Sequence, residues 1–175
     1  MTKRLNYTPL TIAAVLSLSA FCFAGQTDSN EPVPASHVEI EPIGSTPETK
    51  FGKLVTFCMD KDGNLLACDS GAGHIRKISP DGKTLATWEL DFVPYAITAY
   101  GKSTIYVAGQ GTLARLDKKG HLVKRIQSDG ENFPEGKPSG ITAAGKDVFL
   151  SVGSGWSLRS RSSVVRFDRN LNKPT

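Results

Sequence analysis

The chain has 175 residues, of which 39% are hydrophobic and 22% charged, as in a soluble globular domain. Its 21 Lys and Arg exceed its 17 Asp and Glu by only four charges, and no five like charges follow one another. Because a nucleic-acid surface needs a concentrated basic patch or arm, we expect no nucleic-acid partner.

Residues 1–24 have the features of a signal peptide. Lys3 and Arg4 supply a positive start, and an apolar run extends from Leu10 to Ala24, where small residues begin. About 15 apolar residues span only ~22 Å as a helix, less than the ~30 Å hydrocarbon core, so we expect no stable membrane insertion after processing. Cleavage near Ala24 predicts a periplasmic or secreted protein.

Residues 25–50 are rich in Pro, Ser, Thr and Glu and poor in apolar residues. This composition predicts a linker or an extended arm. Within it, Val38–Glu41 alternate apolar and polar side chains, which is the pattern of a single short strand.

From Phe51 onward the chain repeats itself three times. Phe57, Ile97 and Ile141 occupy equivalent positions, which gives periods of 40 and 44 residues. Each unit contains a short apolar strand, a Gly-containing turn, a second strand, a Gly-rich loop, a third strand and another turn. A fourth strand follows in the first two units.

This pattern predicts an all-β fold made of β-propeller blades, each with four antiparallel strands. The second strands, LLACD, IYVAG and VFLSV, are apolar and poor in helix formers, and the third strands, IRKIS, LARLD and VVRFD, alternate. We place the blades at about 51–90, 91–130 and 131–175.

The string DKDGNLLACDSGAGHIRKISPDGK, from Asp60 to Lys83, resembles an NHL repeat. The resemblance weakens in the later units, where Gly109 and the Val152–Gly153 pair stand at the position of Asp69. It implies a six-bladed, TolB-like propeller related in shape to the gluconolactonase and senescence-marker families, with about three of six blades present.

The third unit lacks a fourth strand, and a bare strand edge is avoided by folded proteins. A truncated chain explains this. Alternatively, two copies supply six blades, and the Val38–Glu41 strand of each completes the third blade of the other, so self-association is a second possibility.

The loops after strands two and four of a blade emerge on one face, where we expect ligands. Asp69 and His74 lie on this loop face. Asp69 is a candidate ligand group, or it caps its own loop by accepting backbone N–H groups. His37 and His121 are predicted elsewhere, so no zinc triad forms around His74, and we predict no metal site.

The longest loop of the third unit, GSGWSLRSRSS, adds Trp156, Arg159 and Arg161 to the loop face. An aromatic ring with two arginines suits an anionic sugar, a carboxylate or an acidic peptide. The alternative is a solvated insertion with no ligand.

Cys58 and Cys68 flank a turn in a chain predicted to be exported. If the hairpin is symmetric about Gly63, they lie opposite each other, and either a disulfide or two buried thiols results. If the turn is shifted by one residue, they face opposite sides of the sheet.

These features favour a binding or scaffold propeller whose partner is a small anionic or sugar ligand, or another protein. We see no catalytic set and no cofactor motif. The alternative is a metal-dependent, lactonase-type hydrolase whose Ca²⁺ or Zn²⁺ ligands lie partly in further blades.

Overall fold

The computed structural model describes residues 42–44, 46–47, 49–153, 162–172 and 174, and the structural statements below concern these residues. They form eleven strands and no helix, within one compact unit spanning Glu41–Thr175. The described residues therefore contain no helix that is long and apolar enough to cross a membrane. The predicted signal peptide and the predicted strand at Val38–Glu41 lie outside the described residues.

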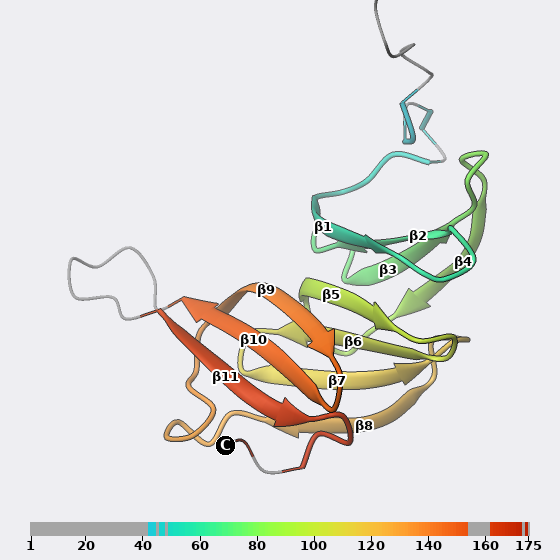
Figure 1. Cartoon of the computed structure of the whole chain (residues 1–175). Coiled ribbons are helices and arrows are strands. Elements are labelled where there is room, and N and C mark those ends of the chain that lie inside the picture. Colours follow the sequence, from blue (N-terminus) through green and yellow to red (C-terminus); the bar gives the residue numbers. More distant parts are fainter. Residues whose placement is uncertain (1–41, 45, 48, 154–161, 173, 175) are drawn as a thin grey trace, which may run out of the picture. The chain divides into compact units, whose positions relative to one another are not determined.

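The strands form three antiparallel sheets in which sequential strands are neighbours (Figure 1). Blade 1 contains β1 (Leu54–Met59), β2 (Leu65–Asp69), β3 (His74–Ile78) and β4 (Thr84–Glu89). Blade 2 contains β5 (Pro94–Tyr100), β6 (Thr104–Gly109), β7 (Thr112–Asp117) and β8 (Leu122–Gln127). Blade 3 contains β9 (Lys137–Ala144), β10 (Asp147–Gly153) and β11 (Ser163–Asp168).

The first strands of the three blades lie next to one another, with β5 between β1 and β9 (Figure 1). The fourth strands, β4 and β8, are the last strands of their sheets, at the edges away from β1 and β5. This is the order expected for consecutive propeller blades, whose first strands line a central channel.

Two apolar cores lie between the blades, because the middle sheet is apolar on both faces. In β6, Ile105 and Val107 belong to the core shared with blade 1, and Tyr106 and Ala108 belong to the core shared with blade 3. Successive residues of a strand point to opposite faces, so this buried run divides between the two cores.

The same kind of turn follows the first strand of blade 1 and the third strands of blades 2 and 3. In each turn an aspartate side chain accepts hydrogen bonds from two backbone N–H groups, which stabilises the turn. The acceptors and their donors are Asp60 with Asp62 and Asn64, Asp117 with Lys119 and His121, and Asp168 with Asn170 and Asn172, at 2.8–2.9 Å.

The β1–β2 register differs from the hairpin expected to be symmetric about Gly63. Cys58 lies opposite Leu66, and Cys68 lies opposite Thr56. The Asp60 bonds close a turn that runs from Asp60 to Asn64, so the hairpin is symmetric about Asp62 instead. The two cysteines share one face as diagonal neighbours, and both are free thiols rather than a disulfide.

The end of the Pro-rich arm is attached to blade 1. Arg76 of β3 donates hydrogen bonds to the carbonyl oxygens of Thr49 (2.6 Å) and Lys50 (2.7 Å). Its guanidinium also lies 4.8 Å from the centre of the Phe51 ring. These hydrogen bonds attach the last residues of the predicted linker or arm, Thr49 and Lys50, to blade 1.

Candidate functional site

An open groove lies where the first strands of the blades begin. Its volume is about 490 Å³. Because β1, β5 and β9 all start here, the groove opens at the loop-face end of the predicted channel. It is lined by Val55, Thr56, Tyr95, Lys137, Pro138, Ser139 and Gly153.

Lys137 and Tyr95 form the central pair of this groove. The Lys137 ammonium lies 4.4 Å from the centre of the Tyr95 ring, within cation–π distance. Tyr95 follows the first residue of β5, and Lys137 is the first residue of β9, so neighbouring first strands hold the pair.

Gly136 sets the position of Lys137. A Cβ atom at residue 136 would lie 2.4 Å from Cγ1 of Val152 and 2.9 Å from the carbonyl oxygen of Gly153. Any side chain here would push the start of β9 away from β10, so glycine permits the close approach that places Lys137 over Tyr95.

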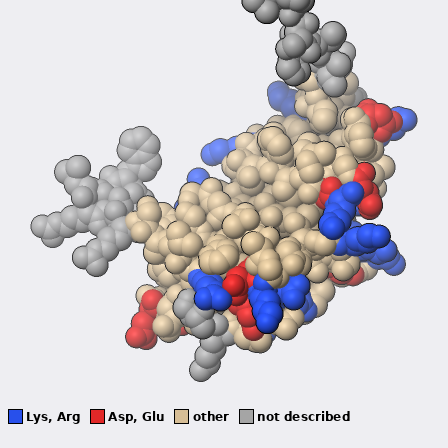
Figure 2. Space-filling model, viewed as in Figure 1, with Lys and Arg blue, Asp and Glu red and all other residues tan. Residues whose placement is uncertain are grey.

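The groove combines a cation, an aromatic face and hydroxyl groups. Among the described residues, Lys137 has no ion-pair partner, and Ser139 shares a 2.7 Å hydrogen bond with Ser151. An aromatic ring can stack against a sugar, and an unpaired ammonium attracts a carboxylate. Figure 2 shows charged side chains gathered mainly along the right and lower parts of the face in view, and much of the rest of this face is uncharged.

Asp69, one of the candidate ligand residues, makes its hydrogen bonds to the backbone of its own blade and of the segment before β1. Its side chain is fully buried and accepts backbone N–H groups from Gly52 (2.8 Å), Lys53 (2.8 Å) and Ala72 (3.3 Å). Burial would by itself raise the pKa of Asp69, but these three hydrogen bonds outweigh it, so the pKa is lowered. The structure thus shows the loop-capping alternative, extended to the segment before β1.

His74 also points into this internal cluster. Its Nε2 atom lies 3.8 Å from the Asp69 carboxylate and 3.2 Å from Nε of Arg76, and only 17% of the side chain is exposed. His74 is therefore separate from the groove at Tyr95 and Lys137, and the two predicted ligand residues Asp69 and His74 support the fold around Arg76.

Trp156, Arg159 and Arg161 lie outside the described residues, so their predicted role stays a prediction. Among the residues that are described, no three His, Cys, Asp or Glu side chains come together as they would to hold a metal ion. Burial raises the pKa of the Cys58 thiol to about 11 and that of Cys68 to about 12, which makes both poor nucleophiles at neutral pH.

Sequence reasoning did not single out Tyr95, Lys137 or Ser139. Nothing in the local sequence distinguished these residues from other residues at the ends of strands. The usable signal is the repeat itself: Pro94 and Pro138 are equivalent, so the residues beside them start the first strands.

The solved structures with a similar fold include three proteins that are 15–18% identical to this chain. A Bacteroides caccae protein of unknown function has a TM-score of 0.55 and 15% identity, over 67% of this chain and 46% of that protein. Virginiamycin B lyase from Staphylococcus aureus has a TM-score of 0.55 and 18% identity, over 73% of this chain and 41% of that enzyme. A streptogramin B lyase has a TM-score of 0.53 and 15% identity, over 68% of this chain and 38% of that enzyme.

The chain therefore spans less than half the length of each of these proteins. No protein-family model matches the sequence, and no curated protein matches it. The structural likeness and the four-stranded sheets confirm the predicted fold class: the chain is all-β and forms part of a β-propeller. The closer relation to NHL repeats and gluconolactonases stays a prediction.

Proposed function

We propose that this chain is part of an exported binding propeller that holds a small sugar carrying a carboxylate at the loop-face groove. The observation that carries the proposal is the Lys137–Tyr95 pair at 4.4 Å in a groove of about 490 Å³. The ammonium would pair with the carboxylate, and the ring would pack against the sugar. Thr56 and Ser139 would offer hydroxyl groups to the sugar.

Glucuronate tests this proposal, with glucose as the uncharged comparison. We expect glucuronate to bind the chain more tightly than glucose in a calorimetric or NMR titration. Lys137→Gln and Tyr95→Ala should each weaken glucuronate binding about fivefold or more, since a partly desolvated cation–π or ion pair contributes on the order of 1 kcal/mol. The charge-matched control Lys119→Gln, on an exposed turn, should leave binding within twofold of wild type.

Equal binding by Lys137→Gln and wild type would contradict the role of the groove. Failure of both sugars to bind would contradict the choice of ligand class and leave a protein partner as the remaining candidate for the loop face.

The metal-dependent hydrolase alternative makes a different prediction. If part of a metal site resides in this chain, Ca²⁺ or Zn²⁺ should raise its melting temperature, because a ligand that binds the folded state stabilises it. The binding proposal predicts no such rise.

A further inference from the structure

A second cavity, of about 320 Å³, lies between blades 2 and 3 at the opposite end of the strands from the groove. It is lined by side chains of β5, β6 and β7 and by the turn after β11. The lining residues used here are Tyr100, Lys102, Tyr106, Arg115, Arg169 and Asn170. We name it the turn-face cavity.

This cavity collects positive charge without an acidic side chain. Arg115 and Arg169 contribute two cations. Lys102 on the β5–β6 turn contributes a third, although it also lines the neighbouring space between blades 1 and 2. None of the three has an ion-pair partner among the described residues. The nearby carboxylates of Asp117 and Asp168 are directed into their own turns, where each accepts two backbone N–H groups, and neither lines the cavity.

The two arginines are held in place before any ligand arrives. Nη1 of Arg115 donates to the side-chain oxygen of Asn170 (2.8 Å) and to the carbonyl oxygen of Arg169 (3.2 Å). The Arg169 guanidinium lies 5.3 Å from the centre of the Tyr100 ring. Each guanidinium keeps further N–H donors free, and a positioned guanidinium binds an oxyanion with little added ordering.

The tyrosines fix the cavity wall. The Tyr106 hydroxyl donates to the carbonyl oxygen of Arg169 (2.8 Å), and the Tyr100 hydroxyl donates to the carbonyl oxygen of Gly145 (2.8 Å). Both bonds join blade 2 to blade 3. The site therefore depends on the packing of two blades and is not a property of one exposed turn.

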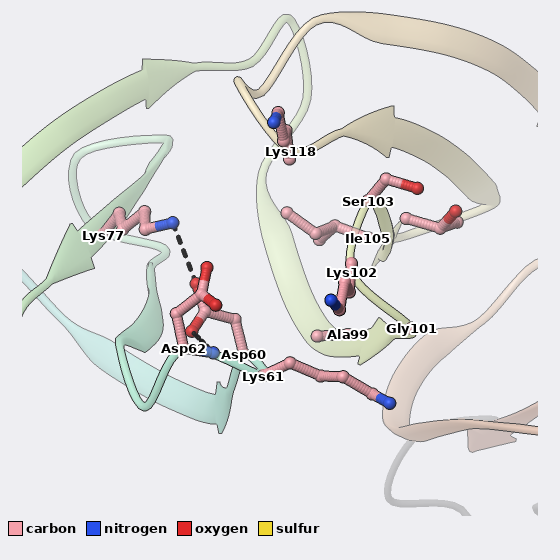
Figure 3. Close-up of a pocket in the computed structure, with 11 residues that line it drawn as sticks. Asp60, Lys61, Asp62, Lys77, Ala99, Gly101, Lys102, Ser103, Ile105 and Lys118 are labelled. Atoms are coloured by element: carbon pink, nitrogen blue, oxygen red, sulfur yellow. Dashed lines mark hydrogen bonds and ion pairs between the residues drawn. The ribbon is translucent and has the colours of Figure 1, made fainter.

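The corresponding space between blades 1 and 2 is different. It has a volume of only about 60 Å³, and Asp60 and Asp62 line it together with lysines, one of which is Lys102 on the turn that the two spaces share. Lys77 reaches across to Asp60, at 2.8 Å, and compensates its charge (Figure 3). Tyr100 and Lys102 of blade 2 stand where this turn of blade 1 has Asp60 and Asp62, so the turn adds no carboxylate to the turn-face cavity.

We propose that the turn-face cavity binds a doubly charged oxyanion of the phosphate or sulfate type. Arg115 and Arg169, with Lys102 at the cavity edge and no carboxylate in the cavity lining, favour a dianion over a carboxylate, because the Coulomb attraction scales with ligand charge. The planar guanidinium groups of Arg115 and Arg169 match the spacing of oxyanion oxygens. This site is separate from the loop-face groove and does not depend on the function proposed for it.

Inorganic phosphate, sulfate and acetate are the probes for this site, titrated calorimetrically or by NMR into the chain. We expect phosphate and sulfate to bind at one site and acetate to bind at least tenfold more weakly. Arg115→Gln and Arg169→Gln should each weaken phosphate binding about tenfold or more, as expected for loss of a charged hydrogen-bond donor. Lys119→Gln removes one charge from the same face outside the cavity and should change phosphate affinity less than twofold.

Lys102→Gln gives an independent variant, because Lys102 is exposed and makes no bond that the fold requires. It should weaken phosphate binding while leaving the melting temperature unchanged. The proposal is overturned by phosphate binding that all three cavity variants retain, by absence of phosphate binding, or by acetate binding as tight as phosphate. Glucuronate binding that responds to Lys137→Gln but not to Arg169→Gln separates the two sites.

Discussion

Asp69 joins blade 1 to the segment that precedes it. Both carboxylate oxygens accept backbone N–H groups of Gly52 and Lys53, and Arg76 holds the carbonyl oxygens just before them. A Cβ atom at Gly71 would lie 2.8 Å from backbone atoms of Gly52 and Lys53, so the loop after β2 and this segment are in close contact. A single buried carboxylate thus organises backbone groups that would otherwise be unsatisfied.

Asp69→Ala should lower the free energy of unfolding by about 3 kcal/mol, because it removes three hydrogen bonds from backbone N–H groups to a buried carboxylate and leaves the Arg76 charge without its acceptor. Urea denaturation measures this change. Asp62→Ala, at an exposed turn position, is the control and should change stability by less than about 0.5 kcal/mol. Similar stabilities for the two variants would contradict the role assigned to Asp69.

Leu171 occupies a backbone conformation that favours glycine. Its φ is +53°, and Gly82 and Gly120 occupy the equivalent turn position in blades 1 and 2 with φ of +83° and +86°. The leucine side chain is almost fully buried in the core of blades 2 and 3, which offsets the strain.

This balance predicts an unusual order of stability for two variants. Leu171→Gly relieves the strain and loses the burial, whereas Leu171→Ala keeps the strain and loses the burial. We expect both to be less stable than wild type, and the alanine variant to be about 1 kcal/mol less stable than the glycine variant. Thermal or urea unfolding decides this, and an alanine variant at least as stable as the glycine variant would show that the backbone is unstrained.

At the scale of elements, a side chain of one blade packs against a turn of the next blade. Trp88 of β4 belongs to the core of blades 1 and 2. A Cβ atom at Gly120 would lie 2.3 Å from Cγ of the Trp88 ring. Trp88 therefore packs directly on the backbone of the β7–β8 turn, and the fourth strand of one blade contacts the next blade through it.

Gly82 and Gly120 provide a matched pair of substitutions for this contact. Both have nearly equal positive φ, but a Cβ at Gly82 would contact only Ile43, at 3.9 Å. Gly82→Ala should cost about 1 kcal/mol from strain alone. Gly120→Ala should cost roughly 1–3 kcal/mol more, because Trp88 must move. Melting temperatures of the two variants test this difference. When Trp88 is also changed to alanine, Gly120→Ala and Gly82→Ala should cost about the same.

At the scale of the whole molecule, stability depends on carboxylates that are ionised in the folded state. Burial would raise the pKa of Asp60, but hydrogen bonds from Lys77 and Asn64, among others, lower it from 3.8 to about 2. The pKa of Asp69 is lowered as well. A lowered folded-state pKa means that the unfolded chain takes up protons first, so the stabilisation is complete above about pH 4 and is lost as pH falls toward 2.

We therefore expect the free energy of unfolding to fall as the pH is lowered from about 4 to about 2. Asp60→Asn should be less stable than wild type at pH 7 and should show a shallower fall over the acid range. Urea denaturation at a series of pH values measures both quantities. A variant with the same acid slope as wild type would show that Asp60 does not contribute to it.

Large apolar side chains remain exposed on the outer blades. Phe57 and Met59 of β1 and Val164 of β11 are each more than half exposed. Exposed apolar surface of this kind favours association, so self-association stays a prediction, which light scattering over a range of concentrations would examine.

The repeat in the sequence determined much of this protein. The alternation of apolar residues in β3 and β7, and the Gly-containing turns at fixed positions, predicted the strands and their order, because side-chain direction alternates along a strand and positive φ favours glycine. The all-β propeller class followed from four such strands repeated about every 40 residues.

Only the tertiary structure decided which side chains meet. The sequence left Asp69 as either a ligand residue or a loop cap, because local sequence does not show that Gly52 and Lys53 lie beside it. The turn-face cavity joins Arg115 and Arg169, which are 54 residues apart, and the groove joins Tyr95 and Lys137. Such pairs depend on how one blade packs against the next, and packing between distant segments leaves no periodic signal within either segment.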